Sequence, residues 1–353
     1  MLRTMSQKNL LDYTPLELES LAQELGEPAY RGRQLASWIY QKNVLDFELM
    51  TDLPKSFRSR LLAGAVIEAP TVDHVVNSTD GSRKFILSLS DGKRIHAVLM
   101  PDDDRQTLCL STQVGCGFAC AFCSTGTMGM VRNLTPGEIV GQLLPVRGEL
   151  PPDSRVTHLV FMGMGEPLAN YKATVKALRI FSDPLACGFS PRRITVSTVG
   201  LVKGIENLAR ENLHVNLAIS LHATTDEQRN VLMPINRGYS LGDLLAACRR
   251  FQKPVRRRIF FEYVLLEGVN DSIEDARRLV QLLRGLRAKV NLIPFNEWPG
   301  AHFCRPPLPK VVAFQKVLLD QGLIATIRWS KGEDIGAACG QLQEPTLKEK
   351  VPA

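Results

Sequence analysis

The chain has 353 residues, 44% of them hydrophobic and 22% charged, which is the composition of an ordinary globular protein with room for one large α/β domain and a smaller module. No apolar run approaches the roughly 20 residues that span a bilayer, and the start of the chain lacks the apolar segment of a secretory signal, so we expect a cytoplasmic protein without a membrane anchor. The net charge of +7 is too modest to assign a partner by itself.

The first part of the chain, residues 1–90, is expected to be a small, mainly helical domain. Thr14 is followed by a proline and then by Glu17, a capping box that predicts a helix ending near Leu25. Residues 32–42 form a second amphipathic stretch, which we interpret as a packed helix face.

A β-hairpin is expected to connect this domain to the rest of the chain. Residues 83–101 alternate between apolar and polar side chains and are interrupted by Asp91-Gly92, a sequence typical of a hairpin turn.

From Gln106 onward the pattern strand, loop, helix is repeated. Strands are expected at residues 107–112, 157–163, 193–199, 215–222, 258–265 and 289–295, and helices between or after them include 272–286 and 309–320. Six such units predict an α/β fold in which a parallel sheet curves into a partial (β/α)6 barrel, with the functional residues at the carboxyl ends of its strands.

The end of the chain completes the expected division into three parts. A last strand is expected at residues 324–329, followed by the segment 331–342. We therefore predict the N-terminal domain at 1–90, the barrel at 91–342 and a flexible tail at 343–353.

Two groups of positive residues stand out within the barrel region. Six cations lie within ten residues: Arg249, Arg250, Lys253, Arg256, Arg257 and Arg258. A pair, Arg192 and Arg193, lies at the start of the third expected strand. Such groups favour a polyanion such as RNA, because each cation placed on a phosphate releases counterions. The alternative is a solvated basic surface.

The strongest chemical signal is a group of three cysteines, Cys116, Cys120 and Cys123, directly after the first expected barrel strand. Three thiolates at this spacing can hold three irons of a [4Fe–4S] cluster and leave the fourth iron open to a substrate. A structural zinc ion normally takes four Cys or His ligands, and no fourth ligand is close in the sequence. Structural zinc and free buried cysteines are the alternatives.

The three-cysteine loop resembles that of the radical S-adenosylmethionine (SAM) superfamily. Thr135-Pro136-Gly137-Glu138 is a further capping box, at the place where that fold begins its first barrel helix. The sequence GMGEP at 163–167 resembles the superfamily loop that binds the amino group of SAM. The resemblance implies a [4Fe–4S] cluster that binds SAM and cleaves it reductively to a 5′-deoxyadenosyl radical.

Longer segments resemble one family within this superfamily. FCSTGTMGMVRNL, FMGMGEPLANY, ITVSTVG, LAISLHA, LIPFNEW and GEDIGAACGQL are similar to the RlmN/Cfr family of RNA adenine methyltransferases, over residues 10–342. The resemblance implies SAM contacts at Gly165, Glu166, Ser197, Ser220, Leu221, His222 and Asn296. Taken singly, the two serines, Asn296 and His222 are typical of ordinary strand-end or core residues.

The same resemblance assigns roles to two isolated cysteines. Cys339 corresponds to the family's methyl-carrying cysteine and Cys109 to its resolving partner, whereas each alone would be taken for a structural residue. The implied reaction uses two SAM molecules per turnover: Cys339 is methylated, its methyl group is converted to a radical that adds to the adenine carbon, and Cys109 resolves the adduct. A disulfide between the two cysteines then has to be reduced.

His96 departs from the family pattern. Thirteen residues before Cys109 the family has a glutamate that acts as proton acceptor, and this chain has a histidine there. Imidazole accepts a proton near neutral pH, so His96 is either a substitute for that glutamate or a plain strand residue.

Three functions remain open on the sequence. The first is methylation of adenine C2 in 23S rRNA, at the peptidyl transferase centre, and in tRNA beside the anticodon. The second is methylation of C8 of the same rRNA adenine, as in the Cfr branch. The third is a non-catalytic RNA-binding metal protein. The N-terminal domain, which we expect to assist RNA binding, and the FCSTG sequence favour the first function. This function also implies an external electron donor such as a flavodoxin-type protein. We expect a monomer.

Overall fold

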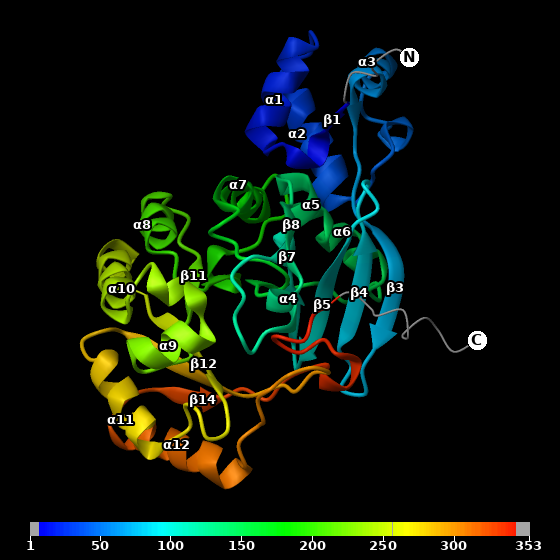
Figure 1. The fold of residues 1–353 in the computed structure, drawn as a ribbon. Coiled ribbons are helices and arrows are strands. Elements are labelled where there is room, and N and C mark those ends of the chain that lie inside the picture. Colours follow the sequence, from blue (N-terminus) through cyan, green and yellow to red (C-terminus); the bar gives the residue numbers. More distant parts are fainter. Residues whose placement is uncertain (1–6, 256, 344–353) are drawn as a thin grey trace.

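A mixed sheet of ten strands runs through the molecule (Figure 1), and the computed structural model describes residues 7–255 and 257–343. The strand order is β14-β13-β12-β11-β10-β9-β6-β5-β4-β3. The strands are β3 (Thr71–Asn77), β4 (Arg83–Ser88), β5 (Arg94–Asp102), β6 (Arg105–Cys109), β9 (His158–Phe161), β10 (Ile194–Thr198), β11 (Asn216–Ser220), β12 (Ile259–Leu265), β13 (Ala288–Pro294) and β14 (Ala325–Ile327).

Seven of these strands are parallel and form the barrel part of the sheet, from β6 through β9–β13 to β14. The six strands expected from the sequence all form, and most are shorter than predicted, as β11 shows by covering five of the eight expected residues. One helix between them begins at the cap that the sequence predicts, Thr135. The helix expected at 272–286 also forms, and Ser272 caps it. The prediction of an α/β partial barrel is confirmed.

The helices and short helical turns connect the strands in chain order. They are α4 (Ser124–Thr127), α5 (Pro136–Gly141), α6 (Leu143–Gly148), α7 (Tyr171–Ser182), η4 (Pro191–Arg193), α8 (Val202–Arg210), α9 (Asp226–Leu232), η5 (Pro234–Arg237), α10 (Leu241–Val255), α11 (Ile273–Leu282), α12 (Leu308–Asp320) and η6 (Glu333–Ile335). A separate two-stranded sheet, β7 (Gln113–Cys116) and β8 (Gly129–Asn133), stands beside the barrel.

The antiparallel strands β3, β4 and β5 extend the barrel sheet on its other side. The expected hairpin forms as β4 and β5, but β5 pairs with β6 and β4 pairs with β3, so the hairpin is part of the main sheet rather than a connector. Strand β3 was not expected, because an edge strand with mostly exposed side chains lacks a clear apolar alternation. The sheet thus begins before residue 90, and the division of the chain at 90 and 342 remains a prediction.

The N-terminal helices form a group of their own next to α5, α6 and α7 (Figure 1). This group contains β1 (Lys8–Asn9), η1 (Leu10–Asp12), α1 (Pro15–Glu24), α2 (Tyr30–Ala36), the π-helical turn η2 (Ser37–Gln41), η3 (Phe47–Leu49), α3 (Lys55–Gly64) and β2 (Ala65–Val66). The expected capping box of α1 forms: Thr14 Oγ1 accepts from the amide of Glu17, and that glutamate accepts from the amide of Thr14. Gly32 allows α1 and α2 to approach closely, since a Cβ there would lie 2.3 Å from the nitrogen of Glu19.

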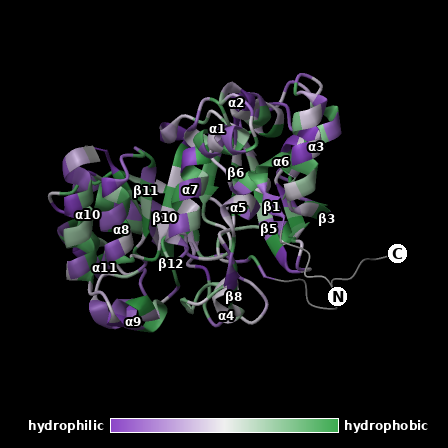
Figure 2. Ribbon diagram, turned by 90° about the horizontal axis from the view of Figure 1, so that it is seen from above, coloured by the Kyte–Doolittle hydropathy of each residue, from purple (hydrophilic) through white to green (hydrophobic). Residues whose placement is uncertain are grey.

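Polar contacts fasten this group to the barrel helices. Arg147 of α6 donates to the carbonyl of Tyr40 at 2.6 Å, and the amide of Gly137 at the start of α5 donates to Asp12 at 2.7 Å. Most strands of the main sheet are hydrophobic, whereas the surrounding helices also carry hydrophilic stretches (Figure 2). Among the described residues, no helix is long and apolar enough to cross a membrane.

Candidate active site

A cavity of about 220 Å³ opens at the carboxyl ends of the barrel strands. Its walls contain the last residues of β6 and β9–β11 and parts of β12, together with the three-cysteine loop and the segment that carries Cys339. Five cysteines line it: Cys109, Cys116, Cys120, Cys123 and Cys339. The fold therefore gathers at one place two cysteines, Cys109 and Cys339, that lie 230 positions apart in the sequence.

The three-cysteine loop is held by its own backbone and by a neighbouring helix. Cys116 ends β7, and Cys123 is the residue before α4. The amide of Cys123 donates to the carbonyl of Cys120 at 3.0 Å, and the amide of Ala121 donates to the carbonyl of Leu232 at the end of α9 at 2.9 Å. The loop thus wraps its thiols toward the cavity, as the sequence predicts.

The chemistry of the three thiols fits an iron–sulfur cluster. Burial raises the pKa of Cys116 to about 11 and also raises the pKa values of Cys120 and Cys123, so the bare thiols would stay protonated at neutral pH. Bound iron ions would offset that cost, because a cation stabilises the thiolate. Among the described residues, no three His, Cys, Asp or Glu side chains are arranged to bind a single metal ion. An iron–sulfur cluster does not require this arrangement, because each thiolate binds a different iron.

The fold brings a fourth cysteine to this loop, although none is close in the sequence. The amide of Ser124, next to Cys123, donates to the carbonyl of Gly340 at 2.7 Å. Gly340 follows Cys339, whose thiol is near enough to Cys123 for the two to affect each other electrostatically. No fourth ligand is close in the sequence, and Cys339 comes near the loop only through the fold.

Cys109 and Cys339 are neighbours across the cavity. Burial raises the pKa of Cys109, and Cys339 is the charged neighbour that raises it most. Cys339 is an exposed residue that lines the cavity, and desolvation of its thiol raises its pKa. Arg328, on the same wall, opposes the rise at both thiols. Cys109 and Cys339, which the family resemblance assigns to one reaction, therefore lie near each other in the structure.

The loop after β9 presents a buried carboxylate to the cavity. Glu166 accepts hydrogen bonds from the amides of Leu168 at 2.9 Å and Val199 at 2.8 Å, and burial raises its pKa to about 7 despite these bonds. Gly165 has a φ of 97°, and a Cβ there would lie 2.5 Å from the side chain of Gln113. The glycine therefore permits the turn that places the carboxylate.

Five of the seven expected SAM contacts line the cavity: Gly165, Glu166, Ser197, Ser220 and His222. His222 adopts the left-handed region with a φ of 56°, and its Nδ1 accepts from the amide of Val264 at 3.0 Å. Burial lowers its pKa to about 3, so the ring is neutral and carries its proton on Nε2.

The other two expected contacts, Leu221 and Asn296, are not among the residues that line the cavity. Leu221 is fully buried, and its backbone takes part in bonds between strand ends. Asn296 donates to the carbonyl of Cys339 at 3.1 Å, which places it as a support of the segment with that cysteine.

His96 is buried and lies outside the cavity wall. Its residue is 1% exposed, and neither ring nitrogen has a hydrogen-bond partner. Burial, aided by Lys84 and Arg94, lowers its pKa to about 3, so the ring is neutral at physiological pH. In register it lies two residues along β5 from Val98, which faces Cys109. His96 is therefore not one of the residues that line the cavity.

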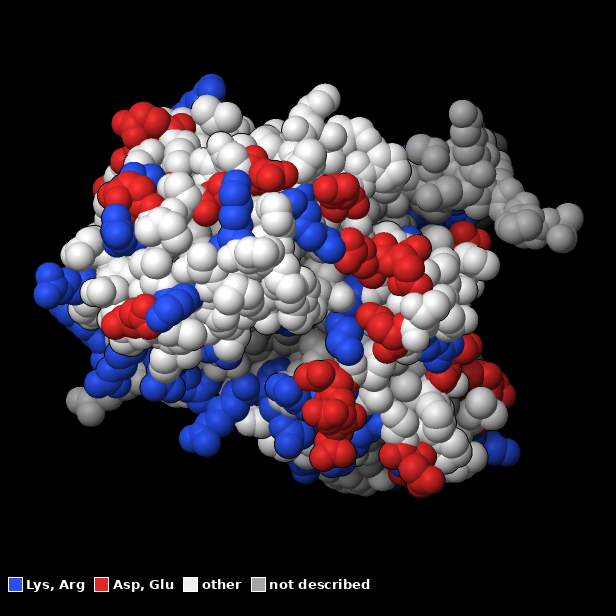
Figure 3. All heavy atoms as spheres, turned by 90° about the horizontal axis from the view of Figure 1, so that it is seen from below, with Lys and Arg blue, Asp and Glu red and all other residues white. Residues whose placement is uncertain are grey.

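The basic groups lie at the opposite ends of the strands. Arg192 and Arg193 precede β10, Arg257 and Arg258 precede β12, and Arg249, Arg250 and Lys253 lie on α10; Arg256 is outside the described residues. Seen from below, Lys and Arg gather along the left and lower left of the molecule (Figure 3). Seven residues at roughly 3.3 Å each separate the two ends of β12 by about 20 Å. The basic groups therefore do not border the cavity.

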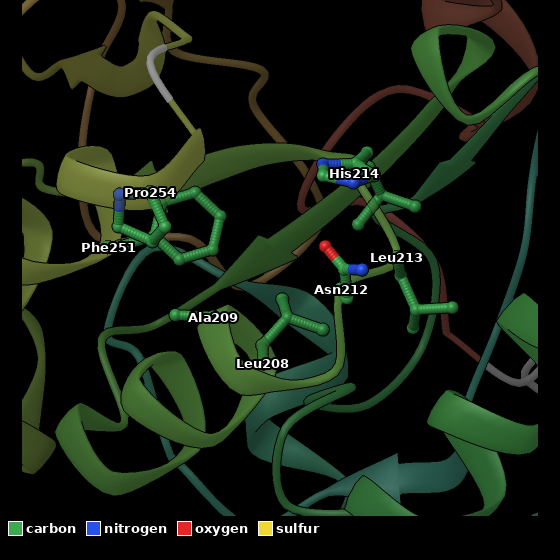
Figure 4. Close-up of a pocket in the computed structure, with 8 residues that line it drawn as sticks. Leu208, Ala209, Asn212, Leu213, His214, Phe251 and Pro254 are labelled. Carbon is green, nitrogen blue, oxygen red and sulfur yellow. The ribbon is translucent and has the colours of Figure 1, made fainter.

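A small crevice of about 50 Å³ lies near these basic residues. Figure 4 shows Leu208 and Ala209 of α8 on one side, Phe251 and Pro254 of α10 on another, and Asn212 to His214 from the loop before β11. Its lining is largely apolar, and it holds none of the cysteines, so we assign the chemistry to the larger cavity.

The sequence interpretation missed four residues of the site or its support: Glu262, Arg328, Trp329 and Arg229. The first three line the cavity, and Glu262 could have been found as an acidic residue inside an apolar strand. Arg229 has no exposed surface, yet its helix reads as an ordinary polar one, so no signal in the sequence marks it.

Comparison with protein families supports this geometry. Residues 110–280 match the description "Radical SAM superfamily", and residues 8–67 match "Ribosomal RNA large subunit methyltransferase N-terminal domain". The chain is 48% identical over 336 residues to "Dual-specificity RNA methyltransferase RlmN" from Syntrophotalea carbinolica, covering 95% of this chain and 89% of that protein. The chain belongs to the RlmN family. Membership implies SAM and an iron–sulfur cluster.

Further relatives agree with this family assignment. The chain is 50% identical to "Probable dual-specificity RNA methyltransferase RlmN" from Moorella thermoacetica, over 93% of this chain and 95% of that one. It also matches the crystal structure of a radical SAM methyltransferase from Sphaerobacter thermophilus with a TM-score of 0.91 and 46% identity, over 95% and 98% of the two chains. The RlmN family fold therefore extends over nearly the whole chain.

Proposed function

We propose that this chain is a radical SAM methyltransferase that methylates C2 of an adenine in 23S rRNA, at the peptidyl transferase centre, and in tRNA, next to the anticodon. The family assignment supports an RNA methyltransferase, since the RlmN relatives are named as dual-specificity RNA methyltransferases. The observation that carries the proposal is the meeting of Cys109 and Cys339 in the cavity that also holds the three-cysteine loop.

The cluster site is proposed at Cys116, Cys120 and Cys123, as a [4Fe–4S] cluster. When bound, the cluster and two SAM molecules per turnover supply the methyl group and the radical that abstracts hydrogen. Gly165, Glu166, Ser197, Ser220 and His222 would contact SAM, and Leu221 and Asn296 would support them from behind.

The residues of the chain account for the fate of the methyl group. Cys339 accepts it on Sγ, and after hydrogen abstraction its carbon bonds to the adenine ring, so RNA and protein are joined. The adduct then gives up the ring proton and one electron, which the bound cluster would accept. The thiolate of Cys109 attacks Sγ of Cys339, so the disulfide forms as the carbon–sulfur bond breaks, and the released carbon takes up a proton and stays on the RNA as the methyl group. Two electrons from an external donor, such as a flavodoxin-type protein, reduce the disulfide. We place this reaction in the cytoplasm and expect the enzyme to act as a monomer.

Two alternatives differ in an observable way. A C8 methyltransferase of the same rRNA adenine would share the cavity and the cysteines, and a non-catalytic RNA-binding metal protein would make no methylated base. Anaerobic reaction of the reconstituted protein with 23S rRNA and tRNA, followed by nucleoside mass spectrometry, separates them. We expect 2-methyladenosine in both RNAs. Only 8-methyladenosine in rRNA would show the second function, and no methylated adenosine the third.

His96 is proposed as the substitute for the family's glutamate. Loss of a proton acceptor slows turnover by roughly a hundredfold or more. His96→Ala should therefore be slow. His96→Glu should stay active without a shift of its pH profile to lower pH, because burial already holds the pKa of His96 at about 3. A His96→Ala enzyme as fast as the wild type from about pH 6 to 9 would show that His96 is a plain strand residue.

A further inference from the structure

Arg229 on α9 is a buried cation without a buried anion bonded to it. None of its surface is exposed (0%), and its hydrogen-bond partners among the described residues are carbonyl and amide oxygens. A buried charge is costly unless it is paired or fully hydrogen-bonded, so such a side chain calls for a structural reason.

The guanidinium group ties together the ends of two neighbouring barrel strands. Its Nε donates to the carbonyl of Leu221 at 3.1 Å, and its Nη2 donates to the carbonyls of Ser220 at 3.1 Å and Val199 at 2.7 Å. Its Nη1 donates to the side chain of Asn236 at 3.1 Å. Arg229 thus fixes the backbone where β10 and β11 end.

These strand ends carry the groups proposed to contact SAM. The amide of Val199, whose carbonyl Arg229 holds, donates to the carboxylate of Glu166. The carbonyls of Ser220 and Leu221 directly precede His222, which adopts a left-handed conformation that few residues other than glycine tolerate. Arg229 therefore reaches both sides of the proposed SAM site through the backbone of the two strand ends.

The same helix also contacts the three-cysteine loop. The carbonyl of Leu232, three residues after Arg229, accepts the amide of Ala121 within that loop. Cys120 belongs to the same buried hydrophobic cluster as Leu232 and Met233. Among the titratable groups near Arg229, Cys120 has the largest electrostatic effect on it, and Arg229 in turn favours the thiolate of Cys120.

We propose that Arg229 is a positioning residue that aligns the SAM-binding strand ends and also supplies the fixed positive charge beside the cluster. This inference rests on the proposed cluster site. Three thiolates give the loop a negative charge, and a buried guanidinium nearby stabilises it more strongly than a solvated cation would, because water does not screen it. Groups outside the ligand set tune a cluster's reduction potential in this way.

The two roles can be separated by two substitutions. Arg229→Gln removes the charge but keeps an amide that donates to carbonyls, and Arg229→Lys keeps the charge but has fewer, differently directed donors. Arg147→Gln is the matched control, because Arg147 also donates to a backbone carbonyl but lies at the N-terminal helices, away from the cavity.

Each anaerobically reconstituted variant is measured without RNA. Electron paramagnetic resonance during a redox titration gives the midpoint potential of the cluster, and equilibrium dialysis gives the dissociation constant of SAM. We expect a more negative potential in Arg229→Gln, because the reduced cluster carries one more negative charge and loses its cation. In Arg229→Lys the potential should stay near that of the wild type while SAM binds about tenfold more weakly, from lost hydrogen bonds. The control should change neither.

The proposal would be overturned if both Arg229 variants had the same cluster midpoint potential and the same SAM affinity as the wild type. A potential that falls equally in Arg229→Lys and Arg229→Gln would also overturn the role of the charge. If circular dichroism shows that Arg229→Gln does not fold, the test rests on Arg229→Lys alone. Unchanged SAM binding in Arg229→Lys would then contradict the positioning role of Arg229. Both readouts are independent of RNA methylation, so a protein that methylates no adenine but shows these shifts would refute the proposed function and leave this inference standing.

Discussion

At the residue scale, burial sets the protonation of the groups around the cavity. Glu166 and the thiols are shifted toward their neutral forms, and so are His96 and His222. The spacing of the cluster cysteines predicted which residues would meet, because their positions follow from one loop. The neighbourhood of Cys339 could not be predicted without the family resemblance, since it depends on how the end of the chain packs on residues far earlier.

His96 makes the stability of the protein sensitive to acid. Its pKa is about 3 in the folded protein and ordinarily 6.5, so the unfolded chain binds more protons between these values. The stability that neutral His96 permits is present above pH 6.5 and is lost as the pH falls toward 3. We therefore expect the free energy of unfolding of His96→Leu to depend less steeply on pH, by up to about 1.4 kcal/mol per unit.

Urea unfolding at several pH values below 6.5 measures this slope. The exposed His74, mutated to leucine, serves as the control and should leave it unchanged. An equal slope in wild type and His96→Leu would show that His96 does not stay neutral in the folded state.

At the element scale, the segment 331–343 is held from two sides. Asp334 accepts from the amide of Thr79, and Asp80 accepts from the amide of Gly332, which joins the segment to the turn between β3 and β4. On the other side, the amide of Ser124 donates to Gly340. Cys339 lies between these anchors.

Capping and periodicity predicted most elements correctly, because α1, α5 and the barrel strands carry local signals. Capping and periodicity could not predict the turn between β3 and β4 that anchors this segment. Strand β3 is exposed, and β7 and β8 are only four and five residues long, so none of the three has a periodic pattern of useful length.

Removing the anchors of β3–β4 should make Cys339 more reactive. Burial alone would raise the pKa of Asp80, but bonds from Gly332 and Ser82 outweigh it and lower the pKa to about 2, so the carboxylate is a strong acceptor at neutral pH. In Asp80→Ala/Asp334→Ala the segment should open more often, and Cys339 should react with iodoacetamide about tenfold faster.

The exposed Cys304 is an internal reference for reagent quality, and Asp320→Ala, which removes a surface ion pair with Lys316, is the control variant. Mass spectrometry of the alkylated peptides gives both rates. Equal reactivity of Cys339 in wild type and double variant would show that these bonds do not restrain the segment.

At the scale of the whole molecule, the reaction site and the basic groups occupy opposite ends of the barrel strands. Lys331 lines the cavity, whereas Arg257 and Arg258 lie at the amino end of β12. The sequence predicted the basic groups but not their distance from the site. That distance arises because the basic groups lie at the amino ends of the strands and the site lies at the carboxyl ends.

RNA binding should reflect this separation. Lys331→Ala should weaken binding to a short RNA hairpin and to full-length tRNA alike, and should lower the salt slope of the binding constant by about 1. Arg256→Ala/Arg257→Ala/Arg258→Ala should affect only the longer RNA, whose phosphates reach beyond the cavity. Filter binding at several salt concentrations gives the slopes. A triple variant that binds both RNAs like the wild type would remove the basic group from RNA recognition.

The central claim is that Cys339 carries carbon to RNA and Cys109 releases it, and denaturing gel electrophoresis of single-cysteine variants tests it most directly. After anaerobic reaction with labelled RNA, Cys109→Ala should retain a covalent protein–RNA species, because the adduct forms but no thiol resolves it. Cys339→Ala should cleave SAM yet give neither adduct nor methylated RNA. The absence of a crosslink in Cys109→Ala, or full methylation by Cys339→Ala, would contradict the account.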